Sequence, residues 1–170
     1  MTHEEYEQAA SYWTDKEAEA RRMPEDELRQ VVDAFLSSHN TCALACGWGD
    51  FVRCTPLEYA WRDGVVWIFT EGGLKFRALE HNPAVSLAVF EPYGSSKGLM
   101  GAQVSGVAEV VDPEGGDFAE AVRARGIADE MLPTVRTMLH LLRITPTRVD
   151  YLDSSLRARG YDVRQWIDPA

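Results

Sequence analysis

The chain has 170 residues, 45% of them hydrophobic, and its 17 basic and 27 acidic side chains give a formal net charge of −10. This composition is typical of one globular domain and excludes collagen-like repeats, coiled coils and extended disorder. The acidic excess repels phosphate backbones and anionic membranes over most of the surface, which argues against general nucleic-acid or lipid binding. An anionic ligand would therefore have to be held by a local cluster of cations.

Two helices are predicted in the first 38 residues, which are charged and rich in helix formers. Pro24 divides them, because proline is favoured in the first turn of a helix, and the acidic residues 25–27 suit the positive end of the helix dipole. In the second helix the apolar residues recur at helical spacing and predict one apolar stripe. They are Leu28, Val31, Val32, Phe35 and Leu36.

From residue 41 onward, β-branched and aromatic runs separated by turn signals predict strands. These runs are residues 41–48, 51–61, 64–70, 84–90, 99–111 and 141–152. Asp63-Gly64 favours a tight two-residue turn, so the second and third strands are expected to pair antiparallel. Gly101 and Gly106 are expected as bend or bulge points of the fifth strand, and residues 145–147 as an interruption of the sixth.

Short helices are predicted at residues 74–82, 117–125 and 132–139. Six mostly antiparallel strands with flanking helices predict one α+β domain built on a small barrel. Its parts are N-terminal helices in residues 1–38, a barrel with crossover helices in 39–152 and a C-terminal tail in 153–170. The sequence has no GxGxxG motif and no P-loop, so dinucleotide or triphosphate binding by those routes is not expected.

Residues 51–90 contain the groups most suited to an anionic ligand. Arg53 lies on a strand face among apolar residues, where a guanidinium needs an anionic partner. Gly72-Gly73 leads into a helix that opens with Lys75, and backbone N–H groups at this helix start, with the ammonium, would cradle a phosphate that Arg53 clamps. The alternative is a glycine turn with surface cations, in which Arg53 is solvated or paired with Glu58 or Glu71.

The order of the motifs is characteristic: an arginine-containing strand, a glycine hairpin, an aromatic strand ending in threonine, a lysine after a turn, a leucine, an Asn-Pro motif, a Gly-x-Ala strand and a final strand. They are Val52-Arg53-Cys54-Thr55-Pro56-Leu57, Val66-Trp67-Ile68-Phe69-Thr70, Lys75, Leu79, Asn82-Pro83-Ala84-Val85-Ser86-Leu87, Val104-Ser105-Gly106-Val107-Ala108-Glu109-Val110 and Arg143-Ile144-Thr145-Pro146-Thr147-Arg148-Val149. This order resembles the pyridoxamine-5′-phosphate-oxidase-like, FMN-binding split-barrel superfamily over about residues 29–152. Within it, residues 39–45, 49–56 and 71–75 resemble a little-characterised bacterial branch.

The resemblance implies a six-stranded, mostly antiparallel split β-barrel of the Greek-key type and a homodimer with two FMN molecules at its interface. Arg53 and Lys75 would hold the phosphate, and the backbone of residues 54–57 with the strand end at 69–71 would line the isoalloxazine ring. The candidate cofactor-binding residues are Arg53, Cys54, Thr55, Pro56, Leu57, Phe69, Thr70, Glu71, Gly73, Lys75, Gln103 and Trp166.

The function implied first is that of an FMN flavoprotein, an oxidoreductase that uses flavin electron transfer on an unidentified small molecule. The alternatives are a non-catalytic flavin- or haem-binding or sensing dimer of the same fold, and a dimeric interaction protein with an empty groove. The arginine–glutamine pair and the C-terminal arginine of the biosynthetic oxidase do not align securely with Gln103 or Arg164, so the resemblance does not extend to pyridoxamine-phosphate oxidation. No counterpart of the histidine-rich loop of haem-degrading relatives follows Leu152, which gives haem weak support.

The remaining polar candidates are weaker. Cys42 and Cys46 lie on one face of a strand but about 13 Å apart, too far to share one metal ion, so no metal site is expected. Cys54 would lie near the flavin, where a redox role is a minor alternative. Trp166 either packs in its own subunit or covers the partner's pocket, and His140 is expected to be structural.

No Ser-His-Asp pattern or paired carboxylate motif is present, so no catalytic residue is assigned. Residues 1–7 are polar, no apolar stretch is long enough to cross a bilayer, and three clustered cysteines suit a reducing compartment, so a cytoplasmic location is expected.

Overall fold

The structure is a computed structural model that describes residues 1–92 and 98–168. Its helices, in chain order, are α1 (His3–Glu17), α2 (Glu25–Ser38), α3 (Lys75–Leu79), α4 (Gly116–Ala124), η1 (Asp129–Met131), α5 (Leu132–Met138) and η2 (Ser154–Arg159). Its strands are β1 (Thr41–Trp48), β2 (Phe51–Glu58), β3 (Ala60–Arg62), β4 (Val65–Thr70), β5 (Ala84–Phe90), β6 (Met100–Val110), β7 (His140–Asp153) and β8 (Arg164–Ile167). None of the helices among these residues combines the length and apolarity needed to cross a membrane.

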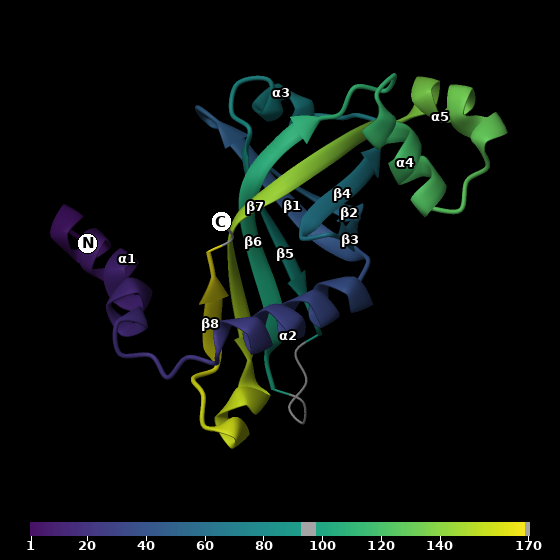
Figure 1. The fold of residues 1–170 in the computed structure, drawn as a ribbon. Helices are drawn as coiled ribbons and strands as arrows, with labels where there is room; N and C mark the ends of the chain where they lie inside the picture. The colour runs from purple at the N-terminus through teal and green to yellow at the C-terminus, as the bar shows by residue number, and fades with distance from the viewer. Residues whose placement is uncertain (93–97, 169–170) are drawn as a thin grey trace.

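The strands form one antiparallel sheet that curls into a half-barrel (Figure 1). Seven of them follow the order β2-β1-β5-β6-β7-β4-β3, and β8 pairs with β7 beside this path. The two end strands of the order, β2 and β3, are separated in the chain by Tyr59 alone, so the chain itself connects the two edges of the sheet. This α+β split barrel confirms the fold class that the sequence predicts.

The core fills the concave side of the sheet. The apolar stripe of α2 contributes Leu28, Val32, Phe35 and Leu36, which pack with the inward-facing residues of β1, β4, β5, β6 and β7. Tyr59 fixes the connection between β2 and β3 to this core, since its hydroxyl donates to the carbonyl of Leu36 at 2.7 Å.

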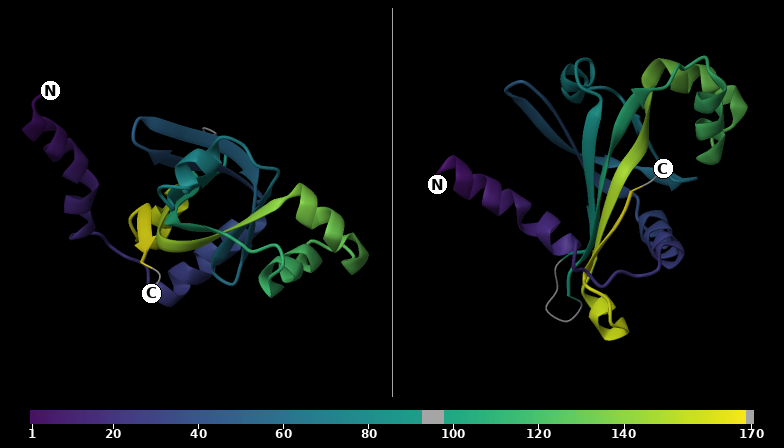
Figure 2. Two further views of the ribbon diagram at one scale, coloured as in Figure 1. Left: turned by 90° about the horizontal axis from the view of Figure 1, so that it is seen from above. Right: turned by 60° about the vertical axis from the view of Figure 1, so that its left-hand side comes forward.

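A second, smaller cluster lies on the outer side of β4 and β7, where α4 and α5 project from the barrel (Figure 2). Phe118 and Val122 of α4 are fully buried there, and Phe69 of β4 packs edge-on against Phe118 with ring centroids 5.7 Å apart. Both clusters depend on the alternation of side chains along β4, whose odd and even residues face opposite sides.

The structure corrects the strand count from six to eight. The predicted strand at residues 51–61 is two strands, of which β2 pairs with β1 and only β3 pairs with β4 around the Asp63-Gly64 turn. Both turn residues have positive φ, 54° and 74°, as a tight hairpin requires. The additional strand β8 lies in the segment predicted as a tail.

The predicted interruption at residues 145–147 is a bulge within a continuous β7. The register shifts there opposite Ser105 and Gly106 of β6, so Pro146 is accommodated without ending the strand. The predicted helix at 74–82 is shorter, since α3 ends at Leu79.

Gly106→Ala should destabilise the fold, because a Cβ at this bulge would lie 2.6 Å from the Thr145 carbonyl oxygen and 2.9 Å from Ile144 Cγ2. We expect a loss of about 2–3 kcal/mol in the free energy of unfolding, measured by urea denaturation. The matched control is Gly116→Ala at the start of α4, where a Cβ meets no atom within 4 Å. It should leave stability unchanged or raise it, and equal effects of the two substitutions would contradict the steric account.

Candidate functional site

Arg53 and Lys75 lie at one end of the barrel, on β2 and at the start of α3. Arg53 pairs across the β1–β2 ladder with Cys46, and the Cys46 thiol donates to the backbone carbonyl of Lys75 at 3.8 Å. The structure thus brings the two predicted phosphate ligands together through one intervening residue.

The Lys75 side chain is buried, with 5% of its surface exposed. Its ammonium donates to the carbonyl of Gly72 and lies 5.5 Å from the ring centroid of Phe76. Burial lowers the pKa of Lys75, the Cys46 sulfur opposes this, and the nearby Arg53 charge lowers that pKa further. A buried ammonium beside a guanidinium is an arrangement that an anion between them would stabilise.

Carboxylates neutralise most of the other arginines but not these two cations. Arg143, for example, pairs with Glu109 and Asp117, and Arg125 pairs with Glu58 at 2.9 Å. Arg53 itself is exposed, so the predicted position of its guanidinium among apolar residues is wrong, because the strand lies at the edge of the sheet order. Glu58, an alternative partner for Arg53, pairs with Arg125 instead. Within residues 1–92 and 98–168, Arg53 and Lys75 form no ion pair.

The loop between β4 and α3 requires its two glycines, since φ is +128° at Gly72 and +104° at Gly73. Thr70 ends β4 and its hydroxyl bonds to both backbone groups of Gly72, at 3.3 and 3.4 Å. The start of α3 offers fewer free backbone N–H groups to a phosphate than the sequence predicts. The N–H groups of Phe76 and Arg77 already donate to carbonyls within the turn. Side-chain charge rather than helix-end N–H groups is therefore the main attraction for an anion.

Contacts with β1 hold α3 in place. The Asn82 side chain donates to the carbonyl of Gly47 at 2.8 Å, and the ring of His81 stacks on Trp48 with centroids 4.0 Å apart. These contacts hold the segment that follows α3 against β1, the strand that pairs with β2.

The predicted lining of the flavin ring is distributed over β2 and the end of β4. Cys54 and Pro56 are exposed on one side of β2, whereas Thr55 and Leu57 are half-buried on the other. Phe69 does not face this region, since its side chain packs against α4, and only its backbone is available, together with Thr70 and the exposed Glu71. β2 and β4 approach one another although they are not neighbours in the sheet order.

Gln103 and Trp166 lie away from this end of β2. The ladder register places Pro56, Ala43, Ala88 and Gln103 in one row across four strands. At about 4.8 Å per strand, Gln103 lies about 14 Å from Pro56 along the sheet. Trp166, on β8, is two strands further along.

Trp166 is packed inside its own chain. It is 9% exposed, its carbonyl accepts a hydrogen bond from Arg22 at 2.6 Å, and the Arg22 guanidinium lies 4.2 Å from the ring centroid. This arrangement corresponds to the first of the two alternatives that the sequence left open for Trp166.

Fourteen neighbouring residues on the outer face of β2, β1, β5 and β6 are uncharged, although 26% of the chain is charged, and Glu58 of β2 and Glu109 of β6 lie beyond them on the same face. We call these fourteen residues the uncharged sheet face. They are Val52, Cys54, Pro56, Ala43, Ala45, Gly47, Ala84, Ser86, Ala88, Phe90, Gly101, Gln103, Ser105 and Val107. Sequence analysis missed this surface, although small uncharged residues at alternate positions of two strands are a signal that could have shown it.

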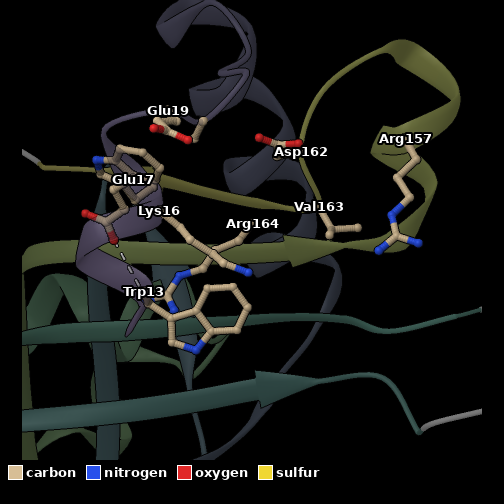
Figure 3. Close-up of a pocket in the computed structure, with 10 residues that line it drawn as sticks. Trp13, Lys16, Glu17, Glu19, Arg157, Asp162, Val163 and Arg164 are labelled. Atoms are coloured by element: carbon tan, nitrogen blue, oxygen red, sulfur yellow. Dashed lines mark ion pairs between the residues drawn. The ribbon is translucent and has the colours of Figure 1, made fainter. Parts of the chain in front are cut away.

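A cavity of about 410 Å³ lies between α1 and the segment that leads into β8 (Figure 3). Trp13 and Lys16 line it from α1, and Arg157, Asp162 and Arg164 line it from the other side. Sequence analysis did not identify this cavity, because it is formed by segments about 150 residues apart.

The cysteines form no metal centre. Cys42 and Cys46 are buried and Cys54 is exposed, and burial raises the pKa of the Cys42 thiol to about 12. In the described parts of the chain, no three His, Cys, Asp or Glu residues are grouped in a way that could hold a metal ion.

Comparison with known proteins gives one family. The sequence model described as pyridoxamine 5′-phosphate oxidase matches residues 28–153, whereas no curated protein matches the chain. A solved structure of a conserved hypothetical protein, Rv2991 from Mycobacterium tuberculosis, is 26% identical with a TM-score of 0.60, covering 84% of this chain and 91% of that one.

Two further solved structures differ in the ligand that their names state. A FAD-binding protein from Mesorhizobium loti is 23% identical with a TM-score of 0.59, covering 71% of this chain and 89% of that one. The haem storage protein HutZ from Vibrio cholerae is 17% identical with a TM-score of 0.57, covering 69% of this chain and 88% of that one. At these identities the two structures show the shared fold.

Proposed function

Because this chain belongs to the pyridoxamine 5′-phosphate oxidase family, whose model covers residues 28–153, we propose that it is an FMN-binding oxidoreductase acting on a small molecule. The observation that carries the proposal is the buried Lys75 ammonium beside Arg53, with no carboxylate to neutralise either charge in the described residues. Two neighbouring cations, one of them buried and neither neutralised, attract an anion to this site in a chain of net charge −10.

The terminal phosphate of FMN fits this pair of cations. Arg53 would bind two phosphate oxygens through its planar guanidinium, and Lys75 would add a point charge from the loop side. The exposed strand β2 and the Thr70–Glu71 end of β4 would then carry the ribityl chain and the ring. Backbone groups rather than acidic side chains would contact the ring in this arrangement.

A dimer would complete the site. A contiguous uncharged patch is typical of an interaction surface, and the fourteen residues here would form part of an interface that typically involves about 20–30 residues a side. We propose that the uncharged sheet face packs against its copy around a two-fold axis. Gln103 lies on this face, about 14 Å from Pro56 of the same chain, and the two-fold contact would bring the Gln103 of a second copy toward the flavin held by the first.

When bound, the flavin would supply hydride or single-electron transfer. The residues of the chain bind and orient it, and they exclude water from one side of the ring through the dimer contact.

The absorption spectrum of the purified protein tests the proposal, followed by anaerobic titration with NADH or NADPH. We expect flavin bands at one FMN per chain, which bleach on reduction. Flavin bands that resist every reductant of this class would indicate the non-catalytic flavin carrier, and a Soret band would indicate haem. Protein that stays colourless and gains no thermal stability from added FMN would contradict both forms of the proposal.

A further inference from the structure

Helix α1 makes few contacts with its own chain. It has 15 residues, begins with a capping box formed by Thr2 and Glu5, and has no buried residue along its length. Tyr6 is 61% exposed and Trp13 is 47% exposed. An isolated helix of this length is only marginally stable in water, so α1 needs a surface that its own chain does not provide.

The C-terminal turn of α1 is nevertheless fixed in direction. Glu17 accepts a hydrogen bond from Arg148 of β7 at 2.5 Å. Its carboxylate also lies 4.0 Å from the guanidinium of Arg164 of β8 (Figure 3). Trp13 packs on Arg164, whose guanidinium carbon lies 5.1 Å from the ring centroid. Asp150 joins both arginines and Asp168 lies 3.6 Å from Arg148, so the anchor is a network of five charged groups rather than one pair.

From this anchor the helix runs away from the barrel, as two views show (Figures 1 and 2). Tyr6, Ala10, Trp13 and Glu17 are spaced four, three and four residues apart, so they lie on one side of the helix. Glu17 and Trp13 face β7 and β8, and Trp13 also lines a cavity of about 320 Å³ with Ala88 and Gln103. Tyr6 and Ala10 therefore face the space in front of the uncharged sheet face.

We propose that α1 is an arm that packs against a second copy of this chain seated on the uncharged sheet face. The inference rests on the dimer of the proposed function. Fourteen residues on that face fall short of the 20–30 a side of a typical stable interface, and the arm supplies additional ones next to them. The aromatic residue Tyr6 on its inward side is of the kind enriched at interface cores.

The composition of α1 favours a protein partner over a lipid surface. The helix carries five carboxylates, Glu4, Glu5, Glu7, Asp15 and Glu17, against the single lysine Lys16. Helices that lie on anionic membranes carry basic residues on the polar face, so a lipid surface would repel this one.

Photo-crosslinking of the full chain tests the contact directly. Tyr6→p-benzoylphenylalanine is compared with Gln8→p-benzoylphenylalanine, since Gln8 lies on the opposite side of the same helix. Mixed dimers of ¹⁴N and ¹⁵N chains distinguish crosslinks between chains from those within one chain. We expect position 6 to give crosslinks between the two isotopes and position 8 to give few. Crosslinks confined to one chain, or equal yields at both positions, would overturn the proposal.

Sedimentation measurements with charge substitutions give a second test. Tyr6→Glu should raise the dimer Kd about 100-fold, because a symmetric dimer loses the contact twice and each aromatic contact is worth about a factor of ten. The control Gln8→Glu adds the same charge on the other side and should leave the Kd unchanged, with equal helix content by circular dichroism in both variants.

The outcomes separate the arm from the dimer. If the unsubstituted chain sediments as a monomer, both the dimer of the proposed function and the arm are contradicted. If the chain is a dimer and Tyr6→Glu leaves its Kd unchanged, the proposal for α1 is contradicted and the dimer is not. Binding of the chain to phosphatidylserine vesicles that depends on Tyr6 would assign α1 to a membrane surface and overturn the proposal.

Discussion

Lys75→Met is expected to lower the affinity for FMN about 100-fold, because it removes a buried, charge-assisted contact to the phosphate while keeping most of the side-chain volume. Arg53→Ala should have an effect of the same order. Riboflavin provides the sharpest comparison, since it has the same ring and ribityl chain without the phosphate. We expect both variants to bind riboflavin as the unsubstituted chain does, so that the preference for FMN over riboflavin is lost.

Fluorescence quenching during flavin titration measures both affinities. Arg77→Ala is the matched control, because Arg77 is an exposed cation two residues further along α3. It should change FMN binding little. If Lys75→Met and Arg53→Ala retain the preference for FMN, the phosphate lies elsewhere and the site assignment is wrong.

The same substitution has an opposite effect on the flavin-free protein. Burial lowers the pKa of Lys75 in the folded chain, so the charged ammonium lowers the free energy of unfolding. This cost is fully present at every pH below the folded pKa. This penalty is lost as the pH rises toward the ordinary lysine value of 10.5. Without flavin, Lys75→Met should therefore unfold at a higher urea concentration at neutral pH, and the difference should vanish at alkaline pH.

Local patterns are sufficient to predict most of the fold. β1 and β5 follow the residue ranges expected from apolar runs between turn signals, and α2 follows from its apolar stripe. The division of residues 51–61 at Tyr59 could not be predicted, because β2 and β3 read as one run and differ only in which distant strand they pair with. β8 escaped prediction for a similar reason, since it is short and depends on pairing with β7.

The candidate site was predictable in part. The motif order brings Arg53 and Lys75 to adjacent elements, and the structure places them on either side of Cys46. The direction of each side chain could not be predicted from the motif order, because it depends on the face of the strand that the residue occupies. Phe69 faces α4 for this reason, and Gln103 lies three strands away from Pro56.

Ala45→Arg is expected to abolish the dimer. Ala45 lies on β1 near the middle of the uncharged sheet face, between Cys54 of β2 and Ser86 of β5. The single chain tolerates an arginine here, since the side chain points away from the barrel, but a dimer would bury two unpaired charges. Such a charge costs about 3–5 kcal/mol, so the dimer Kd should rise at least about 1000-fold. Ala34→Arg, at an exposed position of α2, is the control that should remain dimeric.

The reactivity of the Cys54 thiol provides a second measurement of dimer formation. Cys42 and Cys46 are buried and burial raises the pKa of both thiols, so Cys54 is the thiol expected to react with a disulfide reagent in the folded protein. Its reaction should be slow in the dimer and fast in Ala45→Arg, and FMN affinity should fall together with dimerisation, because the second copy completes the site. Retention of normal FMN affinity by a monomeric Ala45→Arg chain would show instead that one chain binds the flavin alone.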